Sequence, residues 1–123
     1  MRPADFGWLM SGVVLNSFAQ LGLKMATQST GVIEGTPRGM WIAGHQLATS
    51  VAFWLALTAY SLSVAVWVVG LSRLPVSQAY PVLSLGYIIA ALLAWAMLGE
   101  SINVTRWAGI GLIIVGVFFV SRS

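Results

Sequence analysis

The segment from Ala48 to Leu98 decides the fold: ATSVAFWLALTAYSLSVAVWVVGLSRLPVSQAYPVLSLGYIIAALLAWAML. It contains two long apolar runs, at 48–71 and 77–98, which are joined by the short link Ser72-Arg73-Leu74-Pro75. A membrane helix needs about 20 mainly apolar residues to cross a hydrocarbon core of roughly 30 Å, and both runs meet this requirement. We therefore predict two membrane helices with a short turn between them.

Two further runs of the same kind flank this segment. They lie at 6–26 and 104–120, and Gly99–Asn103 forms the turn before the last one. Because lipid cannot satisfy backbone polar groups, the sequence predicts an all-α, integral membrane four-helix bundle that forms one domain over 1–123. Its helices alternate in direction, so both termini lie on the same side of the membrane. The stretch 28–46 is expected to be a long connection between the first two spans, although Met40-Trp41-Ile42 could instead form a short amphipathic segment in the membrane interface.

The composition agrees with a membrane protein. Of the 123 residues, 59% are hydrophobic and 7% are charged, whereas ordinary globular proteins have about 45–50% and 25%. Six basic and three acidic residues cannot cover a soluble domain, which excludes a soluble enzyme and a disordered chain. The basic residues do not cluster, so their pattern does not indicate a nucleic-acid partner. With no cysteine and one histidine, His45, the sequence predicts no metal site and no cofactor.

The first span carries an unusual row of polar residues. Asn16, Gln20 and Lys24 are spaced by four residues, so they lie on one helix face. Lysine near a helix end can reach the membrane surface, and the two amides can simply bond neighbouring helices. Alternatively, the row faces a polar cavity and contacts a substrate, because amides lose hydrogen bonds in hydrocarbon. We expect the second role.

Polar residues recur in the middle of the chain. Tyr80, Ser84 and Tyr87 share one face of the third span, and Tyr60 lies deep in the second. A tyrosine near a helix end often serves only as an interface anchor, which is the simpler interpretation of Tyr87. The hydroxyl of Tyr60 needs a partner inside the membrane.

Small residues predict where helices pack closely. On the second span they recur at the spacing of one helix face, at Ala52, Ala56, Ala59, Ser63 and Gly70. On the fourth span, Gly109 and Gly116 lie seven residues apart beside Leu112, which predicts a contact with another helix or another subunit.

The charged residues bear on the orientation of the chain in the membrane and on whether it couples transport to protons. Arg2, Arg73 and Arg122 lie on one side of the predicted bundle, and Lys24, Arg38 and Arg106 lie on the other, so the count of basic residues does not decide the orientation. No carboxylate lies within a span, although proton-coupled exporters typically need an acid inside the membrane.

These motifs resemble those of a known family. The run Leu74-Pro-Val-Ser-Gln-Ala-Tyr-Pro-Val-Leu-Ser-Leu85 is similar to the start of the third helix in the small subunits of the flippase for 4-amino-4-deoxy-L-arabinose-phosphoundecaprenol. Gln20 with Lys24, and Glu100 followed by Arg106, also match that branch. The four spans and the glycines of the last span resemble the small multidrug resistance fold of the drug/metabolite transporter superfamily. Drug-exporting relatives have an essential glutamate where this chain has Asn16, which argues against proton-driven drug export.

The resemblance implies a multi-pass protein of the bacterial inner membrane, surrounded by lipids and paired with itself or with a related small subunit. Its substrate would be an undecaprenyl-phosphate-linked sugar used for lipid A modification. The phosphate would lie near Lys24 and Arg106, and a polar groove would be lined by Asn16, Gln20, Tyr60, Tyr80 and Ser84.

Two alternatives stay open. The first is an exporter of cationic compounds, with an aromatic cage from Trp54, Tyr60 and Trp67. The second is a subunit that assembles with a larger membrane complex and transports nothing itself.

Overall fold

A computed structural model describes residues 2–123 and, at Ser29, only the backbone. Over these residues the chain folds into α1 (Pro3–Thr30), α2 (Pro37–Ala48), α3 (Val51–Leu71), α4 (Val76–Met97) and α5 (Val104–Arg122). All of them except α2 are long and apolar enough to cross a membrane. The prediction of an all-helical membrane protein with four spans is therefore confirmed.

The helix ends follow local chemistry. The side chains of Thr36, Ser50 and Asn103 each accept a hydrogen bond from a backbone N–H in the first turn of α2, α3 and α5. The first helix is longer than predicted, because it begins at Pro3 and continues to Thr30. Hydropathy marked only its apolar part, whereas the helix ends where Gly31 adopts a positive φ of 73°.

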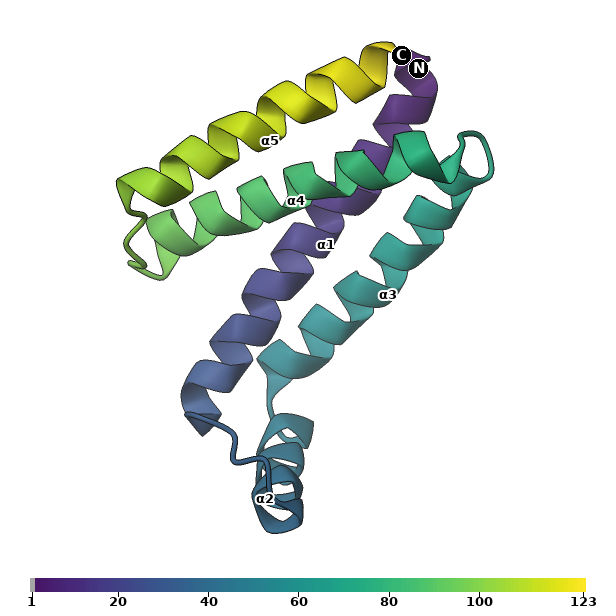
Figure 1. Ribbon diagram of the computed structural model, residues 1–123. Helices are drawn as coiled ribbons and strands as arrows, with labels where there is room; N and C mark the ends of the chain where they lie inside the picture. The colour runs from purple at the N-terminus through teal and green to yellow at the C-terminus, as the bar shows by residue number, and fades with distance from the viewer. Residues whose placement is uncertain (1) are drawn as a thin grey trace.

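The connection expected at 28–46 contains a helix, because its second half belongs to α2. Proline favours the first turn of a helix, and Thr36 caps this one just before Pro37. Met40-Trp41-Ile42 lies on α2 with its side chains exposed. Figure 1 shows α2 beyond the ends of α1 and α3, opposite the end of the molecule where the two termini lie.

The spanning helices form two antiparallel pairs. One pair is α1 with α3, and the other is α4 with α5; α4 crosses α1, while the backbone of α5 lies close to that of α4 alone among the helices described. The N and C termini lie together, as predicted, and the two pairs diverge away from them (Figure 1). At the closed end, a buried cluster is formed by Leu9, Val13, Ala79, Val82 and Val117.

Small residues bring α1 close to α3. Ala56, Ser63 and Gly70 are buried, in agreement with the small-residue face predicted for this span. A Cβ atom added at Gly12 would lie 3.2 Å from the backbone oxygen of Ser63, and one at Gly22 would lie 2.9 Å from the Cβ of Ala56. The α1–α3 pair therefore depends on glycine for its close backbone contact.

Candidate functional site

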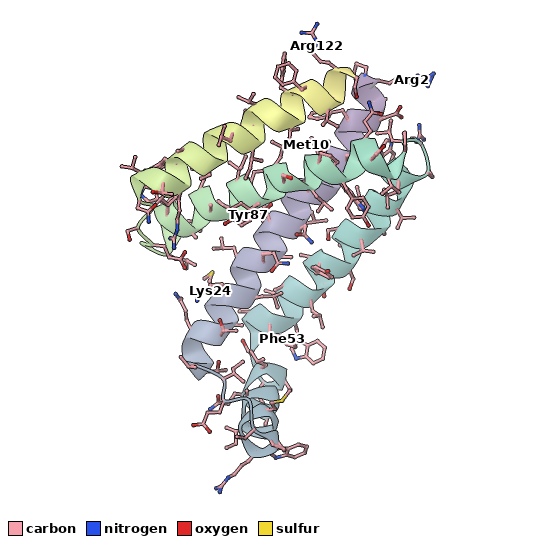
Figure 2. All side chains as sticks on the ribbon, in the orientation of Figure 1. Arg2, Met10, Lys24, Phe53, Tyr87 and Arg122 are labelled. Carbon is pink, nitrogen blue, oxygen red and sulfur yellow. The ribbon has the colours of Figure 1, made fainter. Side chains whose placement is uncertain are left out.

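The polar row of α1 lies outside the packed core. Asn16 is partly buried, and Gln20 and Lys24 are exposed. In Figure 2, Lys24 extends from α1 on the side away from α3, towards the space left by the diverging pairs. The row therefore follows the inner flank of this opening.

A first hollow, the α1–α3 cavity, has a volume of about 150 Å³. It is lined by residues of α1, α3 and α4: Gly12, Val13, Asn16, Tyr60, Ser63, Val64, Trp67 and Leu83. The amide of Asn16 and the ring of Tyr60 share this cavity with the indole of Trp67. It thus offers polar groups and aromatic surface to the same ligand.

A second hollow, the α1–α4 cavity, has a volume of about 330 Å³. Its lining residues come from α1 and α4: Val13, Asn16, Ser17, Gln20, Leu83, Gly86, Tyr87 and Ala90. Asn16 lines both cavities, so it lies between them, and Gln20 continues the polar lining one turn further along α1. Two of the three residues of the polar row are therefore brought to hollows.

A third hollow, the α4–α5 groove, has a volume of about 480 Å³. Its lining combines charged and polar residues with small and aliphatic ones: Tyr87, Ala90, Ala91, Ala94, Glu100, Ser101, Ile102, Arg106, Gly109, Ile110 and Ile113. Tyr87 and Ala90 also line the α1–α4 cavity, so these two residues form a wall shared by both hollows. Arg106 lies in this groove, apart from Asn16 and Gln20.

None of these three hollows is lined by the remaining residues predicted to bind the substrate, which are Lys24, Tyr80 and Ser84. Tyr80 packs edge-on against Trp67, which lines the α1–α3 cavity, with ring centroids 6.1 Å apart. Lys24 is exposed and Ser84 is partly buried. Trp54 does not join Tyr60 and Trp67 in that cavity, because its indole N–H donates to the backbone oxygen of Ala48 at 2.7 Å.

Sequence reasoning missed two buried polar groups. Ser17 is buried and its Oγ lies 3.0 Å from the backbone oxygen of Gly86, which connects α1 to α4. Asp5 is also buried, and its Oδ1 lies 3.8 Å from Nη1 of Arg73 in the α3–α4 link. Neither residue belongs to the row of Asn16, Gln20 and Lys24. The spacing of residues within one helix does not show which residues of another helix they contact.

The predicted subunit-contact residues lie on α5, which is largely uncovered. Leu112 is 74% exposed, and a Cβ atom added at Gly109 or Gly116 would meet no described atom within 4 Å. These glycines are therefore not required by packing inside this chain.

The chain is similar to transporters and flippase subunits. The profile of the EamA-like transporter family matches residues 6–122. A probable 4-amino-4-deoxy-L-arabinose-phosphoundecaprenol flippase subunit ArnF of Erwinia tasmaniensis is 39% identical over 90% of this chain and 89% of its own length. The corresponding probable ArnE subunit of Pseudomonas fluorescens is 35% identical over 93% of this chain and 94% of its own length. The ArnF subunit of Yersinia enterocolitica is 32% identical over 94% and 92%. No solved structure gives a significant match.

Proposed function

Because the chain belongs to the EamA-like transporter family, we propose that it is one small subunit of a flippase for an undecaprenyl-phosphate-linked amino sugar. The substrate is 4-amino-4-deoxy-L-arabinose-phosphoundecaprenol, which the names of its relatives specify. The chain works in the bacterial inner membrane, where this lipid supplies lipid A modification. It forms and breaks no covalent bond in the substrate, so it is a transporter and not an enzyme, and it needs no cofactor.

The observation that carries this proposal is the polar row along the inner flank of α1. A phosphate charge is very costly to place in hydrocarbon, so a path for the headgroup must replace its water. Asn16 and Gln20 supply amide donors and acceptors at two adjoining cavities. Lys24 adds a positive charge one turn beyond Gln20, where it attracts the phosphate. The undecaprenyl chain stays in the lipid beside the diverging helix pairs.

A second small subunit completes the assembly. The relatives include proteins named ArnE and proteins named ArnF, which supports a complex of two chains of this size. The face of α5 that carries Gly109, Leu112 and Gly116 is the surface that we assign to this contact; Leu112 is exposed on it, and Gly109 lies at its edge, where it also lines the α4–α5 groove. The partner is either a second copy of this chain or a related small subunit.

The test replaces polar residues of the row in cells that depend on this chain for the amino sugar on lipid A. Gln20→Leu and Lys24→Ala should each lower the fraction of modified lipid A about fivefold or more, because each removes a contact to a charged or polar headgroup. Phe18→Leu is the control, since Phe18 is exposed on the opposite face of α1. All variants should reach the membrane in equal amounts.

Full modification in both row variants would remove the basis of the proposal. If such variants still copurified with a second subunit, the chain would instead be an assembly subunit without a transport role.

Export of cationic compounds remains a second candidate, because Tyr60 and Trp67 line one cavity with Asn16. Aromatic faces attract quaternary ammonium groups. Expression of the chain would then confer resistance to a quaternary ammonium compound, and Trp67→Ala would abolish that resistance.

A further inference from the structure

We infer that the α4–α5 groove reads both charges of the substrate headgroup: Glu100 binds its ammonium group, and Arg106 binds its phosphate. This inference rests on the proposed function, and it assigns a role to Glu100 and to the groove that the polar row of α1 does not supply. The isoprenoid chain next to the phosphate lies against the apolar floor of the groove.

The lining of the groove is divided by chemistry. Glu100 and Arg106 contribute opposite charges, and both come from the end of the molecule where α4 turns into α5. The rest of the lining includes Ala90, Ala91 and Ala94, whose short side chains leave room along α4. A ligand with a charged head and a thin apolar chain matches this division.

Glu100 and Arg106 are not in contact with each other. Asp5 and Arg73 form the one ion pair within 4.0 Å in residues 2–123, so Glu100 and Arg106 are not paired. The guanidinium of Arg106 donates through Nη1 to the backbone oxygen of Ser101 at 3.3 Å, which leaves its other donors for a ligand. A lipid with only a phosphate would meet repulsion from Glu100. A headgroup with a phosphate and an amine satisfies both residues.

Aromatic residues place this end of the groove at the membrane surface. Trp95 and Trp107 stack edge to face, with ring centroids 6.1 Å apart. They lie next in sequence to the lining residues Ala94 and Arg106. Tryptophan is enriched at the level of the lipid headgroups, so the two charges lie where a headgroup is found before it crosses.

The groove also adjoins the proposed path of the headgroup. Tyr87 is exposed on α4 and lines both the groove and the α1–α4 cavity (Figure 2). The α1–α4 cavity holds Asn16 and Gln20 on its other side. A headgroup bound at Glu100 and Arg106 is thus separated from the polar row of α1 by the wall that Tyr87 and Ala90 form between the two hollows.

The experiment measures binding of two synthetic probes to the purified full-length chain in lipid nanodiscs. The first probe is farnesyl phosphate linked to 4-amino-4-deoxy-L-arabinose, and the second is the same molecule with its amine acetylated. Acetylation removes the positive charge, so it should weaken binding to the wild type about tenfold, as expected for loss of a charge-assisted hydrogen bond. In Glu100→Gln the two probes should bind within about twofold of each other. Arg106→Gln should weaken both probes by a similar factor.

Matched controls separate the groove from general charge effects. Glu34→Gln and Arg38→Gln remove an acid and a base from the connection and α2, outside the groove, and should keep the tenfold preference for the amine. Ala94→Leu fills the floor of the groove and should weaken both probes, whereas Ala96→Leu, at an exposed position outside the lining, should not.

The outcomes distinguish this inference from the proposed function. Binding that keeps the same preference for the amine in Glu100→Gln would overturn the inference alone. Equal competition by phosphatidylethanolamine would also overturn it, because the groove would then be a site for bulk membrane lipid. No binding of either probe to the wild type would overturn the proposed function and the inference together.

Discussion

Ser17 connects the two helix pairs through one hydroxyl group. Its side chain is 1% exposed, and its Oγ lies 2.8 Å from the backbone oxygen of Val13 and 3.0 Å from that of Gly86. Glycine at position 86 suits this contact, since a Cβ atom there would lie 3.0 Å from Cγ1 of Val13, which would have to shift. Ser17 thus links α4 to α1 within the lining of the α1–α4 cavity.

We predict that Ser17→Ala lowers the free energy of unfolding in detergent by about 0.6–1.7 kcal/mol, the range measured for hydrogen bonds between membrane helices. Ser11→Ala is the control, because the exposed hydroxyl of Ser11 bonds only to Gly7 within its own helix. Equal stability of the two variants would show that the bond between α1 and α4 contributes nothing.

Asp5 and Arg73 fasten the start of α1 to the α3–α4 link. The Asp5 side chain is 7% exposed, whereas that of Arg73 is 47% exposed and its guanidinium lies 6.0 Å from the ring centroid of Trp8. Solvent screens the pair from the side of Arg73, so its contribution to stability is modest.

A double-mutant cycle tests this pair. Arg73→Gln should destabilise the wild type more than it destabilises Asp5→Asn, with a coupling of about 0.5–1 kcal/mol in unfolding experiments. Additive effects of the two substitutions would mean that the carboxylate and the guanidinium do not interact.

At the scale of elements, α1 and α3 are joined by close backbone contact. We predict that Gly12→Leu costs about 1–3 kcal/mol of unfolding free energy, because its side chain would collide with the backbone of Ser63 and Trp67. Gly7→Leu lies on the same helix and is the matched control, since a Cβ atom there has open space. If both variants unfolded alike, helix propensity and not packing would explain the loss.

On the exposed face of α5, a bulky residue is expected to weaken subunit association and to leave the stability of the single chain unchanged. Gly116→Leu should leave the stability of the single chain unchanged and weaken association with the second subunit about tenfold, measured by energy transfer between labelled chains in vesicles. Gly111→Leu is the control, because Gly111 lies on the other side of the helix from Gly109 and Gly116. Undiminished association of Gly116→Leu would move the subunit contact elsewhere.

The elements themselves were predictable to different degrees. Apolar runs located all four spanning helices, because lipid demands helices wherever such runs cross it. The end of α1 and the bounds of α2 were not predicted, since polar helices near the membrane surface carry no strong hydropathy signal; only Met40-Trp41-Ile42 was noted as a possible amphipathic segment. Thr36 and Pro37 are the local signals that could have revealed α2.

At the scale of the molecule, the diverging pairs carry cations on both arms. Lys24 belongs to α1 and Arg106 to α5, and both lie near the helix ends opposite the termini. Arg2, Arg73 and Arg122 lie at the closed end, so the charges of the folded chain are as balanced as the sequence indicated. The count of basic residues at the two ends therefore does not decide the orientation of the chain.

The sequence predicted one polar groove, whereas the structure distributes Asn16, Gln20 and Tyr60 over the α1–α3 and α1–α4 cavities and places Arg106 in the α4–α5 groove. Spacing along α1 correctly grouped Asn16 with Gln20, because residues four apart share a helix face. It could not separate Arg106 from them, since that separation depends on how α4 crosses α1 and keeps α5 apart. The crossing is set by contacts such as Gly86 against Val13, which no periodicity within one helix encodes.

In the proposed path, the polar row of α1 faces the headgroup while it crosses the membrane. Photo-crosslinking tests it most directly: a benzophenone amino acid is placed at position 20 or at position 18, and the farnesyl-phosphate amino sugar is added to the chain in vesicles. If the row faces the headgroup, we expect a lipid adduct in the mass spectrum of the chain labelled at position 20 and little or none at position 18. Adducts of equal yield at both positions, or at position 18 alone, would contradict it.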